Sequence, residues 1–148
     1  MALHSDFREF IELAISMNLK FVIIGGWAYN RYAEPRATGD IDFFVEKSEE
    51  SEKVTRELLT EFGFGSALPE GPLFEKDVIM LGHAPYRIDL LTKIDGVTFG
   101  EVWETREYES FYGLRVPFIS LEKLIKNKAS TGRNQDHVDV EKLRRKLT

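Results

Sequence analysis

Two aspartates in one short segment carry the clearest chemical signal in this sequence. Asp40 and Asp42 stand in GDIDFFV, where alternate residues of a strand share one face, so both carboxylates point away from the apolar side. Two carboxylates ~5 Å apart repel by roughly 3 kcal/mol at an effective dielectric of ~20, so a fold that keeps them together normally supplies a cation. Their hard oxygen ligands favour Mg²⁺ or Mn²⁺.

A glycine pair upstream predicts a site for an anion. The apolar run 21–24 has the character of a central strand, and Gly25 and Gly26 end it with a turn that needs unusual backbone angles. If 27–33 continues as a helix, its free N–H groups and the positive end of its dipole point out of that turn. These groups would attract a phosphate, so the segment supplies half of a nucleotide site.

The glycine turn before a helix and the Asp-x-Asp strand after it resemble the nucleotidyltransferase superfamily, which has the DNA polymerase beta-like fold. The resemblance implies an α+β (mixed α/β) domain with a central twisted sheet, mostly antiparallel or mixed, flanked by helices. It also implies a third carboxylate from a later strand, which YRIDLL supplies as Asp89. The Arg36-Ala37-Thr38 segment resembles small prokaryotic nucleotidyltransferase-like proteins related to abortive-infection toxins. Lincosamide-modifying enzymes are more distant relatives with a similar GGW start.

This resemblance implies metal-dependent transfer of NMP from an NTP, for example ATP, to a hydroxyl acceptor. Asp40 and Asp42 would bind two Mg²⁺ or Mn²⁺ ions. Asp89 would share one of these ions and is also the candidate general base. The acceptor class stays open among a small molecule, a protein side chain and an RNA end. Two alternatives are a non-catalytic nucleotide-binding or toxin–antitoxin-type interaction protein on the same fold, and a metal-dependent nuclease.

The residues expected at the nucleotide phosphates include three side chains as well as the glycine pair; the full set is Gly25, Gly26, Arg36, Thr38 and Lys128. For Arg36 the alternative is a pair with a carboxylate that holds its loop. For Thr38 the alternative is a structural role. For Lys128 the alternative is a solvated position on an amphipathic helix.

The C-terminal part resembles the family pattern Leu-Ile-x-x-Lys, then Arg, then Lys-Asp-x-x-Asp. Here the pattern reads Leu124-Ile125, Lys128, Arg133, Gln135-Asp136 and Asp139, so glutamine stands in place of the second lysine. Asp136 and Asp139 fall in the first turn of a helix, where the helix dipole or a pair with Arg133 accounts for them without chemistry.

Size and composition predict one cytoplasmic domain over residues 1–148, with a catalytic core at 1–119 and C-terminal helices at 120–148 packed on it. The chain is 43% hydrophobic, and at this length a domain buries ~68–70% of its unfolded surface. Cysteine is absent, and no apolar run approaches the ~20 residues of a membrane span. No membrane partner is therefore expected. We also consider a homodimer that completes the cleft.

The net charge of −5 is unevenly distributed. Residues 1–119 hold 12 Lys and Arg against 21 Asp and Glu, whereas 120–148 hold 8 against 4. The acidic body argues against binding to duplex DNA. For the basic tail, a solvated helix is preferred over RNA binding.

Periodicity and turn residues predict the elements around these motifs. Ser5 is the candidate cap of the first helix, and Gly63 and Ser120 are a stop and a cap further on. Segment 63–74 is interpreted as a short strand and an exposed turn, with a flap as the alternative. The remaining elements are helices at 5–18, 48–62, 121–130 and 134–147, a short helix or an irregular crossing at 97–106, and hairpins at 74–92 and 107–120.

Overall fold

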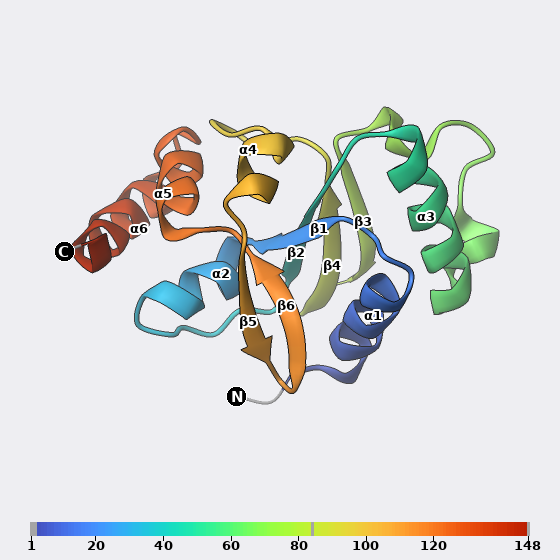
Figure 1. Cartoon of the computed structure of the whole chain (residues 1–148), viewed down its shortest axis with the longest axis horizontal. Helices are drawn as coiled ribbons and strands as arrows, with labels where there is room; N and C mark the ends of the chain where they lie inside the picture. The colour runs from blue at the N-terminus through green and yellow to red at the C-terminus, as the bar shows by residue number, and fades with distance from the viewer. Residues whose placement is uncertain (1–2, 84, 148) are drawn as a thin grey trace.

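The computed structural model describes residues 3–83 and 85–147 (Figure 1). Its strands form one sheet and its helices surround that sheet. The strands are β1 Phe21–Ile24, β2 Ile41–Val45, β3 Val78–His83, β4 Tyr86–Leu91, β5 Glu107–Phe111 and β6 Leu114–Phe118. The α-helices are α1 Ser5–Ser16, α2 Gly25–Tyr32, α3 Glu49–Leu59, α4 Phe99–Glu104, α5 Leu121–Ala129 and α6 Asn134–Arg144.

The sheet is mixed, with the strand order β3-β4-β2-β1-β6-β5. β1 runs parallel to β6, and β2 runs parallel to β4, whereas the remaining neighbours are antiparallel. The two predicted hairpins form its two edges, and the strands on either side of the glycine turn form its centre. The predicted α+β fold with a mixed sheet is confirmed.

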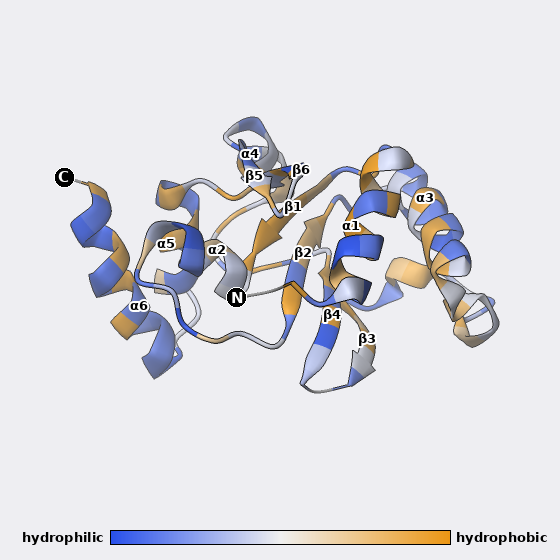
Figure 2. Cartoon of the chain, turned by 90° about the horizontal axis from the view of Figure 1, so that it is seen from below, coloured by the Kyte–Doolittle hydropathy of each residue, from blue (hydrophilic) through white to orange (hydrophobic). Residues whose placement is uncertain are grey.

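The core lies on both faces of the central strands, where β1 and β2 are mostly apolar (Figure 2). Phe43 and Phe44 are neighbours on β2 and therefore point to opposite faces. The ring of Phe10 in α1 lies 5.0 Å from that of Phe43, and the ring of Phe99 in α4 lies 5.2 Å from that of Phe44. Helices thus cover the sheet on both sides and hold β2 rigidly in place.

Two predicted helix caps have different outcomes. Ser120 caps α5 as expected, since its hydroxyl oxygen accepts a hydrogen bond from the Lys123 N–H at 3.3 Å. The prediction for Ser5 was wrong, because α1 is capped by His4, whose Nδ1 accepts from the Asp6 N–H at 3.1 Å. A neutral imidazole nitrogen serves the same purpose there as a hydroxyl oxygen.

The prediction of a strand in 63–74 was also wrong. The segment consists of short turns of helix at Thr60–Phe64, Gly65–Ala67 and Leu73–Glu75. The Arg56 guanidinium donates hydrogen bonds to the carbonyls of Pro69 and Gly71, each at 2.9 Å. A side chain therefore takes the backbone acceptors that a neighbouring strand would have used. Gly63, with φ of 103°, ends the helical register as expected.

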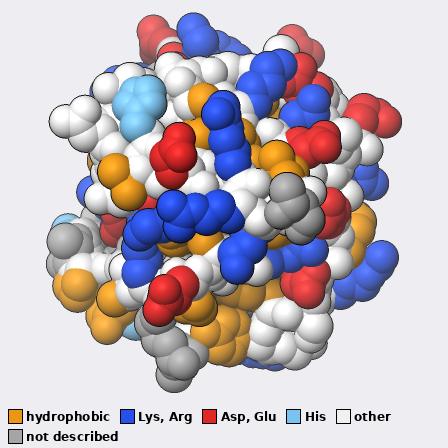
Figure 3. Space-filling view, turned by 90° about the vertical axis from the view of Figure 1, so that its left-hand side faces the viewer, with side chains coloured by type: hydrophobic (Ala, Val, Ile, Leu, Met, Phe, Trp, Pro, Cys, Tyr) orange, Lys and Arg blue, Asp and Glu red, His pale blue; other side chains and the backbone are white. Residues whose placement is uncertain are grey.

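The C-terminal helices α5 and α6 lie together beside α2, at the left of Figure 1. Figure 3 views the molecule from this side, where lysine and arginine side chains are interspersed with aspartate and glutamate. Within residues 3–83 and 85–147, no helix combines the length and the apolar character needed to cross a membrane.

Candidate active site

Asp42 and Asp89 are brought together by strand pairing. They are Cα partners on the parallel strands β2 and β4, so their side chains leave the sheet on the same face. Ile24, the last residue of β1, is the partner of Asp42 on its other side. The two carboxylates therefore stand at the end of the strand that leads into the glycine turn.

The glycine turn is shaped by the carboxylate of Asp42. Gly25 has φ of 68°, which side-chain-bearing residues rarely adopt, and a methyl group added there would collide with Asp42 Oδ2. A methyl group on Gly26 would lie 2.6 Å from Thr38 Oγ1. Both glycines are therefore required because the turn, the loop before β2 and the Asp42 side chain meet at one point.

Asp40 joins the two carboxylates through a residue that the sequence reasoning missed. Asp40 directly precedes β2, and its Oδ2 lies 3.1 Å from a terminal nitrogen of Arg87 on β4. The same guanidinium donates from Nε and a terminal nitrogen to the two oxygens of Asp89, at 2.7 and 2.9 Å. Because Arg87 stands two residues before Asp89 on a strand, the alternation of YRIDLL already placed both on one face.

The three aspartates differ in burial. Asp89 is buried, whereas the Asp40 side chain keeps 38% of its surface exposed. Burial, with the negative charge of Asp89, a hydrogen bond to Asp89 and the charge of Asp40, raises the pKa of Asp42 to about 7, against the smaller opposing effect of Arg87. A carboxylate with so high a pKa lacks a sufficient countercharge. These oxygen donors suit Mg²⁺ or Mn²⁺ by their chemistry, but in the arrangement seen here no three acidic or histidine side chains within residues 3–83 and 85–147 form a group that could hold a metal ion.

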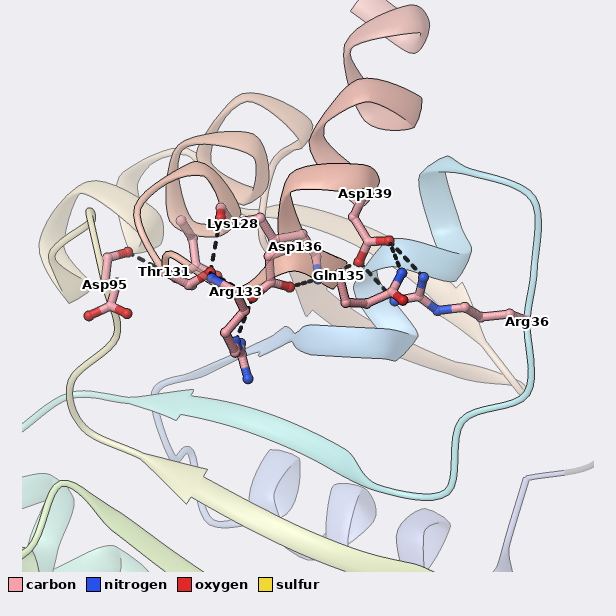
Figure 4. A network of polar contacts seen from close by, with 9 residues as sticks. Arg36, Asp95, Lys128, Thr131, Arg133, Gln135, Asp136 and Asp139 are labelled. Carbon is pink, nitrogen blue, oxygen red and sulfur yellow. Dashed lines mark hydrogen bonds and ion pairs between the residues drawn. The ribbon is translucent and has the colours of Figure 1, made fainter.

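Lys128 and Arg36, both expected at phosphates, instead meet buried carboxylates (Figure 4). The Lys128 ammonium lies 3.1 Å from Asp136 Oδ1 and 3.0 Å from Asp139 Oδ2. Arg36 forms two parallel hydrogen bonds to Asp139, at 2.7 and 2.9 Å. These pairs favour the structural alternative for Arg36, and a phosphate contact by Lys128 stays a prediction.

Hydrogen bonds from several side chains stabilise the charged form of Asp139. Burial acts against that form, but donors from Arg36, Lys128 and Gln135 hold the pKa of the carboxyl well below its ordinary value. Gln135 contributes through Nε2, which donates to Asp139 Oδ1 at 3.0 Å. Gln135 stands at the position where the family pattern has lysine, and it donates a hydrogen bond to Asp139.

The Arg36 pair fixes the loop that leads to Asp40. The amide of Asn30 donates to the Arg36 carbonyl at 2.8 Å and accepts from the Arg36 N–H at 3.1 Å. The Arg36 guanidinium also lies 4.0 Å from the ring centre of Tyr29. Further along the loop, the Thr38 hydroxyl is 3.3 Å from the Asp40 carbonyl. The C-terminal helices thus position the acidic segment through Asp139, which is the carboxylate that the sequence reasoning left unnamed in its alternative for Arg36.

The six-stranded mixed sheet with helices on both faces is the fold of nucleotidyltransferases of known structure. The chain belongs to the family described as "Nucleotidyl transferase of unknown function (DUF2204)", which it matches over residues 5–148. It is therefore a nucleotidyltransferase by family. No curated protein matches it in sequence.

Several solved structures share the fold. The lincosamide antibiotic adenylyltransferase LnuA, bound to lincomycin, superposes with a TM-score of 0.61 at 14% identity, covering 97% of each chain. ANT(2")-Ia in complex with adenylyl-2"-tobramycin gives 0.58 at 14% identity, covering 96% of this chain and 87% of its own. A putative nucleotidyltransferase from Thermotoga maritima gives 0.57 at 16% identity, covering 95% and 89%. At these identities the likeness establishes the fold alone.

Proposed function

We propose that the protein is a metal-dependent nucleotidyltransferase that moves NMP from an NTP to a hydroxyl group. The observation that carries this proposal is the register that pairs Asp42 with Asp89 on neighbouring strands. The pair lies beside a glycine turn, where a side chain at position 25 would collide with the Asp42 carboxylate. Nucleotidyl transfer asks a protein chiefly to position reactants and to neutralise charge, and this arrangement offers both means.

The carboxylates of Asp40, Asp42 and Asp89 would hold the divalent cation, Mg²⁺ or Mn²⁺. Their oxygen donors and the unbalanced charge at Asp42 support this assignment. When bound, the cation neutralises phosphate charge and lowers the pKa of an oxygen that it contacts.

The amino-terminal end of α2 would bind the triphosphate. The helix starts at Gly25, and its first N–H groups donate no hydrogen bond to a capping side chain, because the residue before it is Ile24. Free N–H groups and the helix dipole favour an anion at this end. Gly26, next in the helix, allows the Thr38 side chain of the loop before β2 to pack against this end of α2.

In the reaction, the acceptor hydroxyl oxygen forms a bond to the α-phosphorus as the bond from the α-phosphorus to the bridging oxygen breaks. Pyrophosphate leaves with that electron pair, and the hydroxyl proton passes to Asp89 as general base. The product is a phosphodiester of NMP with the acceptor. The chain's role is to hold the acceptor oxygen and the leaving group in line.

A small, partly apolar molecule is the acceptor class to test first. A cavity of about 600 Å³ lies between β3 and the 64–73 segment, with mostly apolar side chains around it, including Leu68, Leu73 and Met80. Met80, which is 61% exposed and is the Cα partner of Asp89, lies on the face of the carboxylates, whereas Ile79 and Leu81 in the same lining point to the opposite face. Ligand cavities of this size and character bind small molecules. The antibiotics named for LnuA and ANT(2")-Ia are therefore the first acceptors to try.

The test is release of pyrophosphate and transfer of label from α-³²P-NTP, with Mg²⁺ or Mn²⁺ and three acceptor panels. The panels are lincosamides and aminoglycosides, an RNA with a free 3′-hydroxyl, and a cell protein extract. We expect transfer to the first panel, which stops in Asp42→Asn and on chelation of the metal. Shortened RNA without pyrophosphate would instead identify a nuclease.

The contacts of Arg87 favour one alternative, a nucleotide-binding protein without transferase activity. Its guanidinium already pairs with two of the three carboxylates. NTP binding in calorimetry, without pyrophosphate release for any acceptor or metal, would support this alternative. Labelled product from any of the panels would exclude it.

A further inference from the structure

We propose that Arg87 is a built-in counterion that competes with the divalent cation for Asp89 and Asp40 and so sets the affinity of the site for metal. Arg87 would leave these carboxylates when metal binds. The proposal rests on the metal site of the proposed function, but not on catalysis, because it concerns an equilibrium between two cations for the same oxygens.

The hydrogen bonds of Arg87 occupy the oxygens that a metal would need. Nε and a terminal nitrogen bind Oδ1 and Oδ2 of Asp89, and the same terminal nitrogen lies 3.1 Å from Asp40 Oδ2. Two parallel bonds of this kind are among the stronger interactions of a carboxylate. A cation that coordinates Asp89 would share these oxygens with the guanidinium and weaken its two hydrogen bonds, so the two cations compete for Asp89.

The charges leave room for one divalent ion. Three carboxylates and one guanidinium carry a net charge of two negative units when all are ionised. Asp42 has no ion pair within the part of the chain that the structure describes, so its oxygens offer an entry point for a cation. With one divalent cation bound, the ion and the four side chains would sum to zero, so the contacts of Arg87 would be weakened by repulsion from a cation close by and by sharing of the same carboxylates.

Arg87 also has space to leave. Its side chain is 31% exposed, whereas that of Asp89 is 9% exposed. It stands near the start of β4, next to Tyr86, which is 52% exposed and begins the strand. The long side chain can therefore swing toward solvent while the aspartates stay fixed by β2 and β4. Released beside the α2 end, the guanidinium would suit phosphate oxygens, which it binds in a two-pronged geometry.

The experiment is a Mn²⁺ titration without nucleotide, followed by calorimetry and by the EPR signal of free Mn²⁺. The variants are Arg87→Gln, which replaces the charged side chain by a shorter polar one, and Arg87→Lys, which keeps the charge without the two-pronged contact. Arg144→Gln is the matched control, since it removes an exposed arginine of α6. Asp42→Ala defines the signal that belongs to the site.

We expect Arg87→Gln to bind Mn²⁺ more tightly than wild type by at least about fivefold, the lower end of typical coupling between two sites. Arg87→Lys should fall between them, and Arg144→Gln should match wild type. Without metal, Arg87→Gln should melt at a lower temperature than wild type, and Mn²⁺ should raise its melting temperature by a larger increment.

Equal affinity in wild type and Arg87→Gln would overturn the competition. Weaker binding in Arg87→Gln would overturn it too, because Arg87 would then organise the carboxylates for the metal. If Arg87→Gln does not fold, Arg87→Lys decides by the same criteria. Absence of Mn²⁺ binding in wild type and variants alike would remove the metal site itself, and with it the metal dependence in the proposed function. If wild type binds Mn²⁺ and transfers label while Arg87→Gln shows no gain in Mn²⁺ affinity, the proposal for Arg87 fails and the proposed function stands.

Discussion

The Cβ position of Gly25 and the carboxylate of Asp42 compete for the same space, because a methyl group on that glycine would overlap Asp42 Oδ2. The turn and the acidic strand are therefore fitted to each other. Any change that shifts either one alters the point where the phosphates and the carboxylates are proposed to meet.

Gly25→Ala should destabilise the protein by at least about 1–2 kcal/mol, the usual cost of a left-handed backbone for a residue with a side chain, plus the collision with Asp42. Urea denaturation measures the loss of stability, and pyrophosphate release measures the accompanying loss of activity. Gly100→Ala in α4 is the control, since a methyl group there meets nothing within 4 Å. That variant should be neutral or more stable, by up to ~1 kcal/mol.

Asp89→Asn should lower kcat by roughly 10²–10⁴-fold if Asp89 is the general base, while the strand pairing of β4 is kept. Asp42→Ala should abolish metal-dependent transfer and leave the metal-free protein folded, or slightly more stable, because one of the mutually repelling carboxylates is gone. Pyrophosphate release and thermal melting without metal test these two expectations. Full activity in purified Asp42→Ala would refute the site.

The metal-free protein should lose stability as pH rises from about 4 toward 7. The folded pKa of Asp42, about 7, lies above its ordinary value of 3.8, so the folded state holds a proton that the unfolded state has released in this range. Folding therefore favours protonated Asp42, and its contribution is lost as pH passes the folded pKa. Chemical denaturation at several pH values measures this slope, which Asp42→Asn should flatten and saturating Mg²⁺ should reduce.

Asp139→Ala should destabilise the protein by up to about 3–5 kcal/mol, since it leaves the guanidinium of Arg36 without its carboxylate and the buried ammonium of Lys128 with Asp136 as its one remaining ion-pair partner among the described residues. Arg133→Ala removes a cation from Asp136 in the same network, but the Arg133 side chain is 76% exposed, so its loss should cost only ~0–1 kcal/mol. Urea denaturation of the two variants compares them directly. Similar losses in both would contradict the role assigned to burial.

Met80→Glu should weaken the use of apolar acceptors, because it places a charge at the rim of the β3 cavity, opposite Asp89. We expect a rise in KM for the acceptor with an unchanged Kd for NTP. Calorimetry with NTP and steady-state rates with the acceptor separate the two quantities. A rise in both would place Met80 at the nucleotide instead.

The sequence alone determined the elements that local rules control. The alternation of GDIDFFV and YRIDLL predicted two strands with their aspartates on one face, and the glycine pair predicted the turn into a helix, because both patterns act over a few residues. The hairpins and the C-terminal helices followed from turn residues and caps in the same way.

The tertiary structure decided the contacts between segments far apart in the chain. Only the β2 and β4 register sets Asp42 beside Asp89, and only the packing of α6 against the loop after α2 brings Asp139 to Arg36. Arg56 likewise claimed the carbonyls of the segment expected to be a strand. These contacts depend on which distant side chain the fold brings next to a buried charge or a free backbone acceptor. A local sequence pattern extends over a few residues only and does not contain that information.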